Sequence, residues 1–412
     1  MHDETTGQVR QRRVFYIPGY DPFPPRRYRE LYRRESVLQA EISGYRIKLS
    51  GQTGRAGGYG WRAAAQTGGQ HSAAQITVLV WADLVQASMR QGVLGSYWLM
   101  LRTLWIFFST GALVAMIRLR PAPMLSGAYP VAMLLAQAGL ALVLGWLGFR
   151  LSGWALAGIG WGAGWGFWAS AALGLGATYG ALLAFQRLDR KLFAYYLLYD
   201  FAHTAKLRGA NSPALEARIA EFVAQIRAAL SEDWDEVLVV GHSSGAALAV
   251  SVVADVLRGP RPTNAPPLAL LTLGQAIPMQ SFLPRARRLR RDLHDLAARD
   301  DLFWLDVSAP GDGCCFGLSD PVAVSGVAPP AQRWPIVISA AFSKSLRPET
   351  WKRLRRRFFR LHFQYLAAFD NPRDYDYFQI TAGPRTLAAR FAGRKPSPGR
   401  IARLRSPHRD MA

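Results

Sequence analysis

"VVGHSSGAA", residues 239–247, joins a run of aliphatic residues to a run of small ones. Its middle, from Gly241 to Gly245, has the pattern Gly-x-Ser-x-Gly, which arises readily by chance in a chain with 38 glycines, so the flanking residues decide its meaning. Residues 236–240 are typical of a parallel strand buried on both faces, and residues 246–257 favour a helix. A sharp turn between a strand and a helix is where this pattern exposes a nucleophile, so we predict that role for Ser243. A structural glycine-rich turn is the alternative.

The apolar residues of the first half of the chain indicate a membrane protein. Half of the 412 residues are hydrophobic, although the formal net charge is +22. Such a charge favours nucleic-acid binding in a soluble protein, but three apolar tracts, residues 97–117, 130–149 and 151–186, contain Arg102 as their single charge. Each has the roughly 20 residues that cross about 30 Å of hydrocarbon. We therefore expect an integral protein of the cell's inner or plasma membrane, and no nucleic-acid partner.

The chain start and the cysteines favour a cytoplasmic location for the polar part. Residues 1–13 lack the apolar segment of a cleavable signal peptide. The two cysteines, Cys314 and Cys315, are adjacent and fit a reducing compartment. The seven histidines show no metal-ligand spacing, so we expect neither a metal nor another cofactor.

Strand and helix patterns flank the apolar block and predict an α/β fold. Alternation of the two patterns is typical of a mostly parallel sheet with helices on both faces, here interrupted by a transmembrane helical insertion. We expect strands at residues 13–18, 45–49, 76–81, 236–240, 268–274, 302–308 and 334–342, and a loop over residues 51–72. The predicted segments are an N-terminal tail (1–12), the first part of the polar domain (13–96), the transmembrane block (97–186), the second part of that domain (187–392) and a basic disordered tail (393–412).

The number of membrane crossings must be even if both parts of the polar domain lie on one side. The third tract has 36 residues, so it forms two short spans when split near residues 168–170, which gives four crossings in all. Two crossings with a re-entrant tract is the alternative.

A serine nucleophile needs a base and a carboxylate that orients the base. In such a sheet, reacting groups lie in loops at the carboxyl ends of strands. His362 follows the last predicted strand, so we predict that it is the base. Asp312 lies just after the penultimate strand and is the preferred acid, with Asp320 as the alternative; either aspartate also suits a turn cap.

Two backbone N–H groups are expected to bind the oxyanion of the reaction. One belongs to Ser244, directly after the nucleophile, and the other to Gly19 or Tyr20 in the loop after the first strand.

This order of features resembles the α/β-hydrolase superfamily, and the form Gly-His-Ser-x-Gly is similar to its lipase and esterase branches. The resemblance covers residues 13–50 and 213–370 and implies a triad of Ser243, Asp312 and His362 that acts through an acyl-enzyme. The chain departs from the family in having Pro-Gly-Tyr at residues 18–20, where many members have His-Gly, and in its apolar block.

The expected function is that of a membrane-embedded serine hydrolase facing the cytoplasm. Its substrate would be an ester or thioester, as in a lipid or an acylated amphiphile. The basic runs 285–291 and 352–360 and the tail are expected to bind an anionic membrane surface. The alternative is an inactive hydrolase-like membrane scaffold that recruits partners through its basic face.

Overall fold

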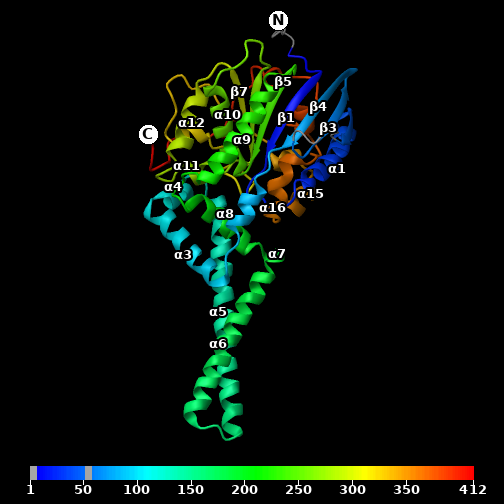
Figure 1. Cartoon of the computed structure of the whole chain (residues 1–412). Coiled ribbons are helices and arrows are strands. Elements are labelled where there is room, and N and C mark those ends of the chain that lie inside the picture. The colour runs from blue at the N-terminus through cyan, green and yellow to red at the C-terminus, as the bar shows by residue number, and fades with distance from the viewer. Residues whose placement is uncertain (1–6, 52–57) are drawn as a thin grey trace. The chain divides into compact units, whose positions relative to one another are not determined.

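The strands of this protein form one mixed, mostly parallel sheet. The structure is a computed structural model and describes residues 7–51 and 58–412. The sheet has eight strands in the order β2-β3-β4-β1-β5-β6-β7-β8 (Figure 1). The pairs from β4 across to β8 are parallel, whereas β2, β3 and β4 are joined antiparallel. The strand bounds are β1 (Gln11–Ile17), β2 (Arg46–Gly51), β3 (Gly60–Thr67), β4 (Gln70–Val78), β5 (Glu236–His242), β6 (Leu268–Leu273), β7 (Leu302–Ser308) and β8 (Ile336–Ser339).

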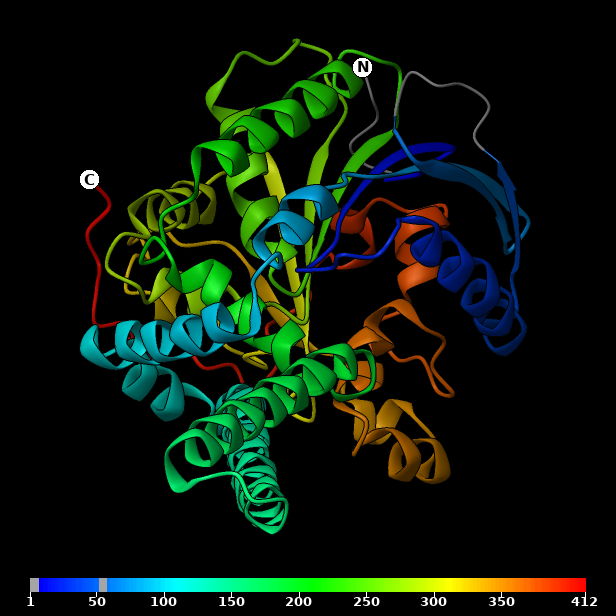
Figure 2. The ribbon, with the colours of Figure 1, turned by 60° about the horizontal axis from the view of Figure 1, so that its bottom comes forward.

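Helices cover both faces of the sheet, which confirms the predicted α/β class. On one face, α10 (Gly245–Arg258) packs on β5 and β6, and α9 (Pro213–Ala229) and α12 (Arg287–Ala297) pack against α10. On the other, α17 (Tyr377–Ala382) packs on β1, β3 and β4, and α1 (Arg26–Ser43) packs against β2. Figure 2 shows these two groups of helices on opposite sides of the strands. The central strand β5 is buried along its whole length, because both of its faces are covered.

Strand β3 corrects the loop predicted over residues 51–72. Residues 52–57 of that loop lie outside the described part, but residues 60–67 pair with β2 and β4. Trp61, Ala63 and Ala65 alternate on the buried side, and Gly68 and Gly69 form the turn into β4 with positive φ. Alanine is depleted in strands, so the composition of residues 60–67 favoured a loop. Pairing with β2 and β4 nevertheless stabilises a strand in which buried and exposed residues alternate.

The described chain forms two compact units that differ from the predicted segments. The first contains the sheet and comprises residues up to 87, residues 107–124 and residues from 207 on; the second comprises residues 88–106 and 125–206. Residues 107–124, predicted within the membrane block, therefore belong with the sheet, and residues 187–206 do not. The remaining helices of the first unit are α4 (Ala112–Leu119), α11 (Ile277–Ser281), α13 (Pro321–Val324), α14 (Phe342–Ser345), α15 (Pro348–Leu354), α16 (Phe358–His362) with η1 (Phe363–Leu366), and α18 (Leu387–Arg390), and most of α2 (Ala82–Ser88).

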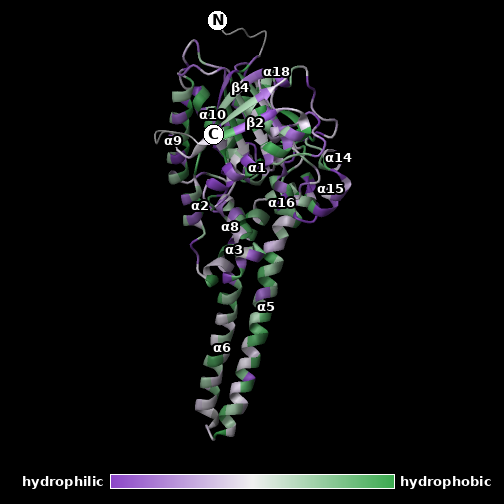
Figure 3. Cartoon of the chain, turned by 90° about the vertical axis from the view of Figure 1, so that its right-hand side faces the viewer, coloured by the Kyte–Doolittle hydropathy of each residue, from purple (hydrophilic) through white to green (hydrophobic). Residues whose placement is uncertain are grey.

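Two helices of the second unit are long and apolar enough to span a membrane. They are α5 (Pro121–Gly158), whose first residues belong to the first unit, and α6 (Ala163–Arg187) (Figure 3). A third span arises only if α3 (Val93–Ser109) and α4, which are bent by 75°, are counted as one. The second unit also contains α7 (Asp189–Leu192) and α8 (Ala194–Ala205).

The break between α5 and α6 does not lie at residues 168–170, where the third apolar tract was predicted to divide into two spans. Residues 168–170 are inside α6, and the chain turns at residues 159–162, where Gly160 has a φ of +84°. Arg150, which separated two predicted tracts, continues α5, since arginine is a good helix former. Four spans are therefore not formed by the described helices.

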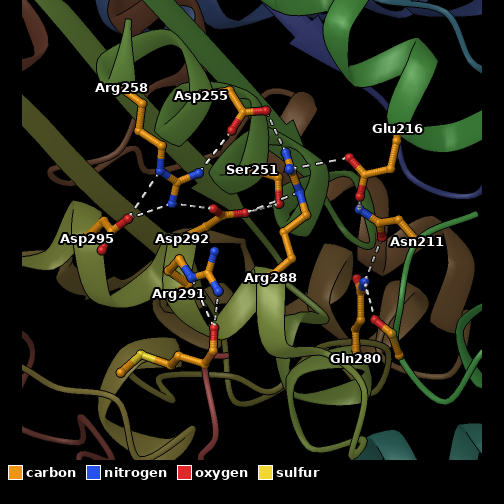
Figure 4. Close-up of polar contacts among 12 residues, drawn as sticks. Asn211, Glu216, Ser251, Asp255, Arg258, Gln280, Arg288, Arg291, Asp292 and Asp295 are labelled. Atoms are coloured by element: carbon orange, nitrogen blue, oxygen red, sulfur yellow. Dashed lines mark hydrogen bonds and ion pairs between the residues drawn. The ribbon is translucent and has the colours of Figure 1, made fainter. Parts of the chain in front are cut away.

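A network of ion pairs joins the three helices on one face of the sheet (Figure 4). Asp292 of α12 is fully buried and lies 2.7 Å from Arg258 of α10. Arg288 bridges Asp255 of α10, at 2.6 Å, and Glu216 of α9, at 3.4 Å. Arg288, which belongs to the predicted basic run 285–291, is thus already paired with acidic residues of the protein.

The last twenty residues differ from the predicted disordered tail. Ile401 forms a parallel bridge with Ser319 through backbone hydrogen bonds to Leu318 and Asp320, and Ser406 is buried. Asp410 lies 2.7 Å from Arg287, and the buried Arg290 donates to the backbone oxygen of Asp410. Backbone hydrogen bonds and ion pairs fix this segment on the protein. The prediction of disorder was wrong because it considered only the scarcity of apolar residues. The predicted tail 1–12 likewise joins the fold from Gln8 on, while residues 1–6 lie outside the described part.

Candidate active site

The turn between β5 and α10 holds Ser243 in a strained backbone conformation. Its φ is +59°, a region that residues with a side chain rarely occupy. A Cβ atom at Gly245 would lie 2.3 Å from the backbone oxygen of Pro18, and one at Gly241 would lie 2.6 Å from the Cβ of Ala249. Both positions therefore require glycine. This geometry agrees with the strained strand-to-helix turn expected from the sequence.

The loop after β1 lies directly against the serine. A Cβ atom at Gly19 would lie 2.9 Å from the Cβ and 3.4 Å from the Oγ of Ser243. The amide of Tyr20 donates to the Oγ of Ser244 at 2.8 Å. The two predicted oxyanion residues of this loop are therefore not equivalent, because the Tyr20 amide is already occupied, whereas Gly19 adjoins the Ser243 side chain.

Asp312, in the loop after β7, is hydrogen-bonded to His362, the last residue of α16. The Nδ1 atom of His362 lies 2.7 Å from the Oδ2 atom of Asp312. The carboxylate also accepts from the Cys314 amide at 2.9 Å and from the Tyr365 hydroxyl at 3.1 Å. Burial raises the pKa of the Asp312 carboxyl, but the charge and hydrogen bond of His362 outweigh this effect and lower the pKa below its usual value. Asp312 is thus a buried carboxylate that fixes the imidazole.

Ser243 and His362 lie against two adjacent residues, Leu273 at the end of β6 and Gly274 directly after it. The Ser243 amide donates to the Leu273 oxygen at 2.9 Å, and a Cβ atom at Gly274 would lie 3.2 Å from the Cε1 of His362. The Nε2 atom of His362 is buried and has no hydrogen-bond partner among the described residues. The structure therefore brings the serine and the histidine to one place without a hydrogen bond from Ser243 Oγ to Nε2.

His242, the residue before the serine, packs on His362 and was not assigned this role from the sequence. The two ring centroids are 4.7 Å apart, and the Nε2 of His242 lies 3.0 Å from the backbone oxygen of His362. Burial, followed by the proximity of His362, lowers the pKa of His242 to about 3. The ring is neutral, and its Nε2 carries the proton because a carbonyl only accepts. His242 therefore links the serine turn to the C-terminal end of α16. Its place inside the Gly-x-Ser-x-Gly pattern was the available signal.

Tyr365 is a second supporting residue that sequence reasoning missed. Its hydroxyl donates to Asp312 and accepts from the Ala309 amide at 2.9 Å. Its position three residues after His362, on the same helical turn, was the only signal for it.

Asp320, the alternative acid, lies elsewhere. It caps α13, where its Oδ1 accepts from the amides of Val322 and Ala323 and its Oδ2 accepts from Gln332. The turn-capping role considered for both aspartates thus applies to Asp320, while Asp312 is the carboxylate that bonds to His362.

Two further features surround the Asp312 loop. Asp312, Cys314 and His362 each offer one ligand atom, and these atoms lie within 4.8 Å of one another, so they form a group able to hold a metal ion. A cavity of about 470 Å³ is lined by residues 309–311 and by Lys344, Arg373 and Arg394, but not by Ser243 or His362.

Comparison of the chain with known protein families, with curated proteins and with solved structures finds no match. The site is therefore interpreted from its own geometry.

Proposed function

We propose that the protein is a serine hydrolase that cleaves an ester or thioester through an acyl-enzyme on Ser243. The observation that carries the proposal is the strained serine, with φ +59°, on a strand-to-helix turn that shares one segment with a hydrogen-bonded Asp312–His362 pair. Strain of this kind persists where the surrounding fold enforces it, and it is frequent at reacting residues. A structural turn alone needs no buried carboxylate–imidazole pair beside it.

The proposed reaction begins with transfer of the Ser243 proton to Nε2 of His362 as Oγ attacks the carbonyl carbon. The tetrahedral oxyanion accepts hydrogen bonds from the amides of Ser244 and Gly19, and each such donor contributes about 3–4 kcal/mol to lowering the barrier. The bond to the leaving oxygen or sulfur then breaks, and His362 returns the proton to that atom. Water, deprotonated by His362, releases the acid and restores the serine. The bond from Oγ to Nε2 forms in this scheme when substrate binds, because such hydrogen bonds are often long in unliganded enzymes.

The α/β-hydrolase resemblance supports this scheme. The serine follows β5, the carboxylate follows β7 and the histidine follows β8, the last strand. The oxyanion loop, the serine and the acid thus follow the carboxyl ends of parallel strands, where α/β sheets place their ligands, and the base comes from α16, after β8.

The proposed setting is a membrane, with the sheet unit on its cytoplasmic side. Residues 107–124 and residues from 207 on belong to the same compact unit, so the α5–α6 pair between them crosses and returns. These two crossings give the even number that keeps both parts of the sheet unit on one side of the membrane. Large apolar side chains on these helices, such as Leu142, Trp146 and Trp165, are more than half exposed and suit a lipid environment.

A lipid or an acylated amphiphile is the proposed substrate, since a membrane-anchored hydrolase meets such molecules directly. The run 352–360 is the better candidate for contact with anionic lipid. Its Lys352, Arg353, Arg355, Arg356, Arg357 and Arg360 are exposed. In the run 285–291, by contrast, Arg288 and Arg290 are engaged within the protein. Nucleic acid is not proposed as a partner.

Labelling with a fluorophosphonate, which reacts with activated serines, tests the proposal. Wild-type protein in detergent is expected to take up one label, and Ser243→Ala none. Ser231→Ala, which removes an exposed hydroxyl after α9, is the matched control and keeps the label. Equal labelling of wild type and Ser243→Ala would overturn the enzyme proposal. Full cellular function of His362→Ala would then favour the inactive scaffold.

A further inference from the structure

The loop that carries the acid also carries a thiol aimed at the same place. Cys314 is two residues after Asp312 and is partly exposed, and its amide donates to the Asp312 carboxylate. One ligand atom each of Asp312, Cys314 and His362 lies within 4.8 Å of the others. Thiolate, imidazole and carboxylate are the three ligand types that zinc binds in proteins.

The ring reaches such an ion through its Nδ1 atom. Nδ1 lies 2.7 Å from the Oδ2 of Asp312, and Nε2 is on the opposite edge of the ring, too far from the carboxylate to share an ion with it. Tetrahedral zinc holds its ligand atoms roughly 3.3–3.6 Å apart. Nδ1 and Oδ2 would therefore move apart by less than about 1 Å, and the ligand atoms that are furthest from one another would approach by about 1.5 Å at most.

We propose that Asp312, Cys314 and His362 bind one Zn²⁺ or a similar divalent cation, and that the bound ion switches the serine site off. Cys314 loses its thiol proton to solvent and binds as the thiolate. The ion takes the lone pair of Nδ1, and the proton that Nδ1 donates to Asp312 moves to Nε2, so that the ring stays neutral. Three protein ligands leave the fourth tetrahedral position to water.

Binding at Nδ1 has a consequence that rests on the function proposed above. The ion replaces the hydrogen bond to Asp312 and leaves the ring proton on Nε2, so that Nε2 can no longer accept the Ser243 proton. The binding itself does not depend on that function.

Cobalt titration of the full-length, chelator-treated protein in detergent tests the binding. Co²⁺ bound to a thiolate absorbs in the near ultraviolet, so the band is expected to saturate at one equivalent and to disappear when Zn²⁺ is added. Cys314→Ser is expected to lose the band and to bind Zn²⁺ at least about tenfold more weakly, the loss that even an outer-sphere substitution causes. Cys315→Ala, which removes the neighbouring buried thiol, is expected to keep it. No band in wild type, or loss of the band in Cys315→Ala alone, would overturn the site.

Thiol alkylation of the wild type provides a test that needs no folded variant. Zn²⁺ is expected to slow the reaction of iodoacetamide with Cys314, read by peptide mass, and an unchanged rate refutes the site. Fluorophosphonate labelling separates the two levels of the proposal. Zn²⁺ should lower labelling of wild type, and the same decrease in Cys314→Ser should need at least about tenfold more Zn²⁺. Cobalt binding without any effect on labelling rejects the switch. Absence of labelling in metal-free protein rejects the hydrolase while the cobalt titration still decides the site.

Discussion

Replacing Gly245 with alanine should uncouple the serine turn from the loop after β1. The new Cβ would lie 2.3 Å from the Pro18 oxygen and 2.6 Å from the Ile17 oxygen, both backbone atoms that cannot rotate away. An ordinary contact is about 3.5 Å, so the end of β1 must move by roughly 1 Å. Gly19 follows directly and lies against Ser243. Misplacement by about 1 Å costs about 100-fold in a positioned reaction, so we expect fluorophosphonate labelling to slow by about that factor.

The rate of labelling, followed by gel fluorescence, measures this effect. The thermal unfolding midpoint is measured beside it, because overpacking of this kind also costs about 1–3 kcal/mol of stability. Gly51→Ala in β2 is the control, since no atom of the residues that the structure describes lies within 4 Å of its added Cβ. If Gly245→Ala labelled as fast as Gly51→Ala, the close approach of the two loops would not matter for reactivity, and the proposed role of Gly19 would be wrong.

Asp312→Asn should slow hydrolysis of an activated ester about 10⁴-fold, as the same change does in a known Ser-His-Asp triad, and a comparable loss in Asp320→Asn would contradict the assignment of the acid. The folded protein keeps His242 neutral with a pKa of about 3, whereas the unfolded chain protonates it near 6.5, so this residue makes stability fall as the pH drops. Between pH 7 and 5 the wild type should therefore lose about 2 kcal/mol more than His242→Gln, and equal shifts of the unfolding midpoint would refute a buried neutral ring. Glu236→Gln should destabilise the fold by about 3–5 kcal/mol, since it leaves the buried Arg12 on β1 without its charge partner at 2.6 Å; an unchanged midpoint would show that the pair contributes little.

Local patterns predicted the serine turn well because its causes are local. The run before Gly241 and the small residues after Gly245 specify a buried strand and a close helix, and the observed strain of Ser243 follows from that junction. Asp312 and His362 were reached by their order along the chain, since parallel strands bring their carboxyl ends to one edge.

Contacts between distant segments could not be predicted from one sequence. The stacking of His242 on His362 joins residues 120 positions apart, and the bond from Tyr365 to Asp312 depends on how η1 packs on the acid loop. Strand β3 could not be predicted from its own residues, because alanine has little preference for strands and the pairing with β2 and β4 stabilises it. The order of the C-terminal segment comes from backbone pairing with Ser319, which composition does not report.

The central claim is that Ser243 is the reacting group, and identification of the labelled peptide tests it most directly. Fluorophosphonate-treated protein is digested and the adduct is located by mass spectrometry. A single adduct on Ser243, lost in His362→Ala, is the predicted result. An adduct on another residue, or none on the peptide that contains residues 239–247, would contradict the account.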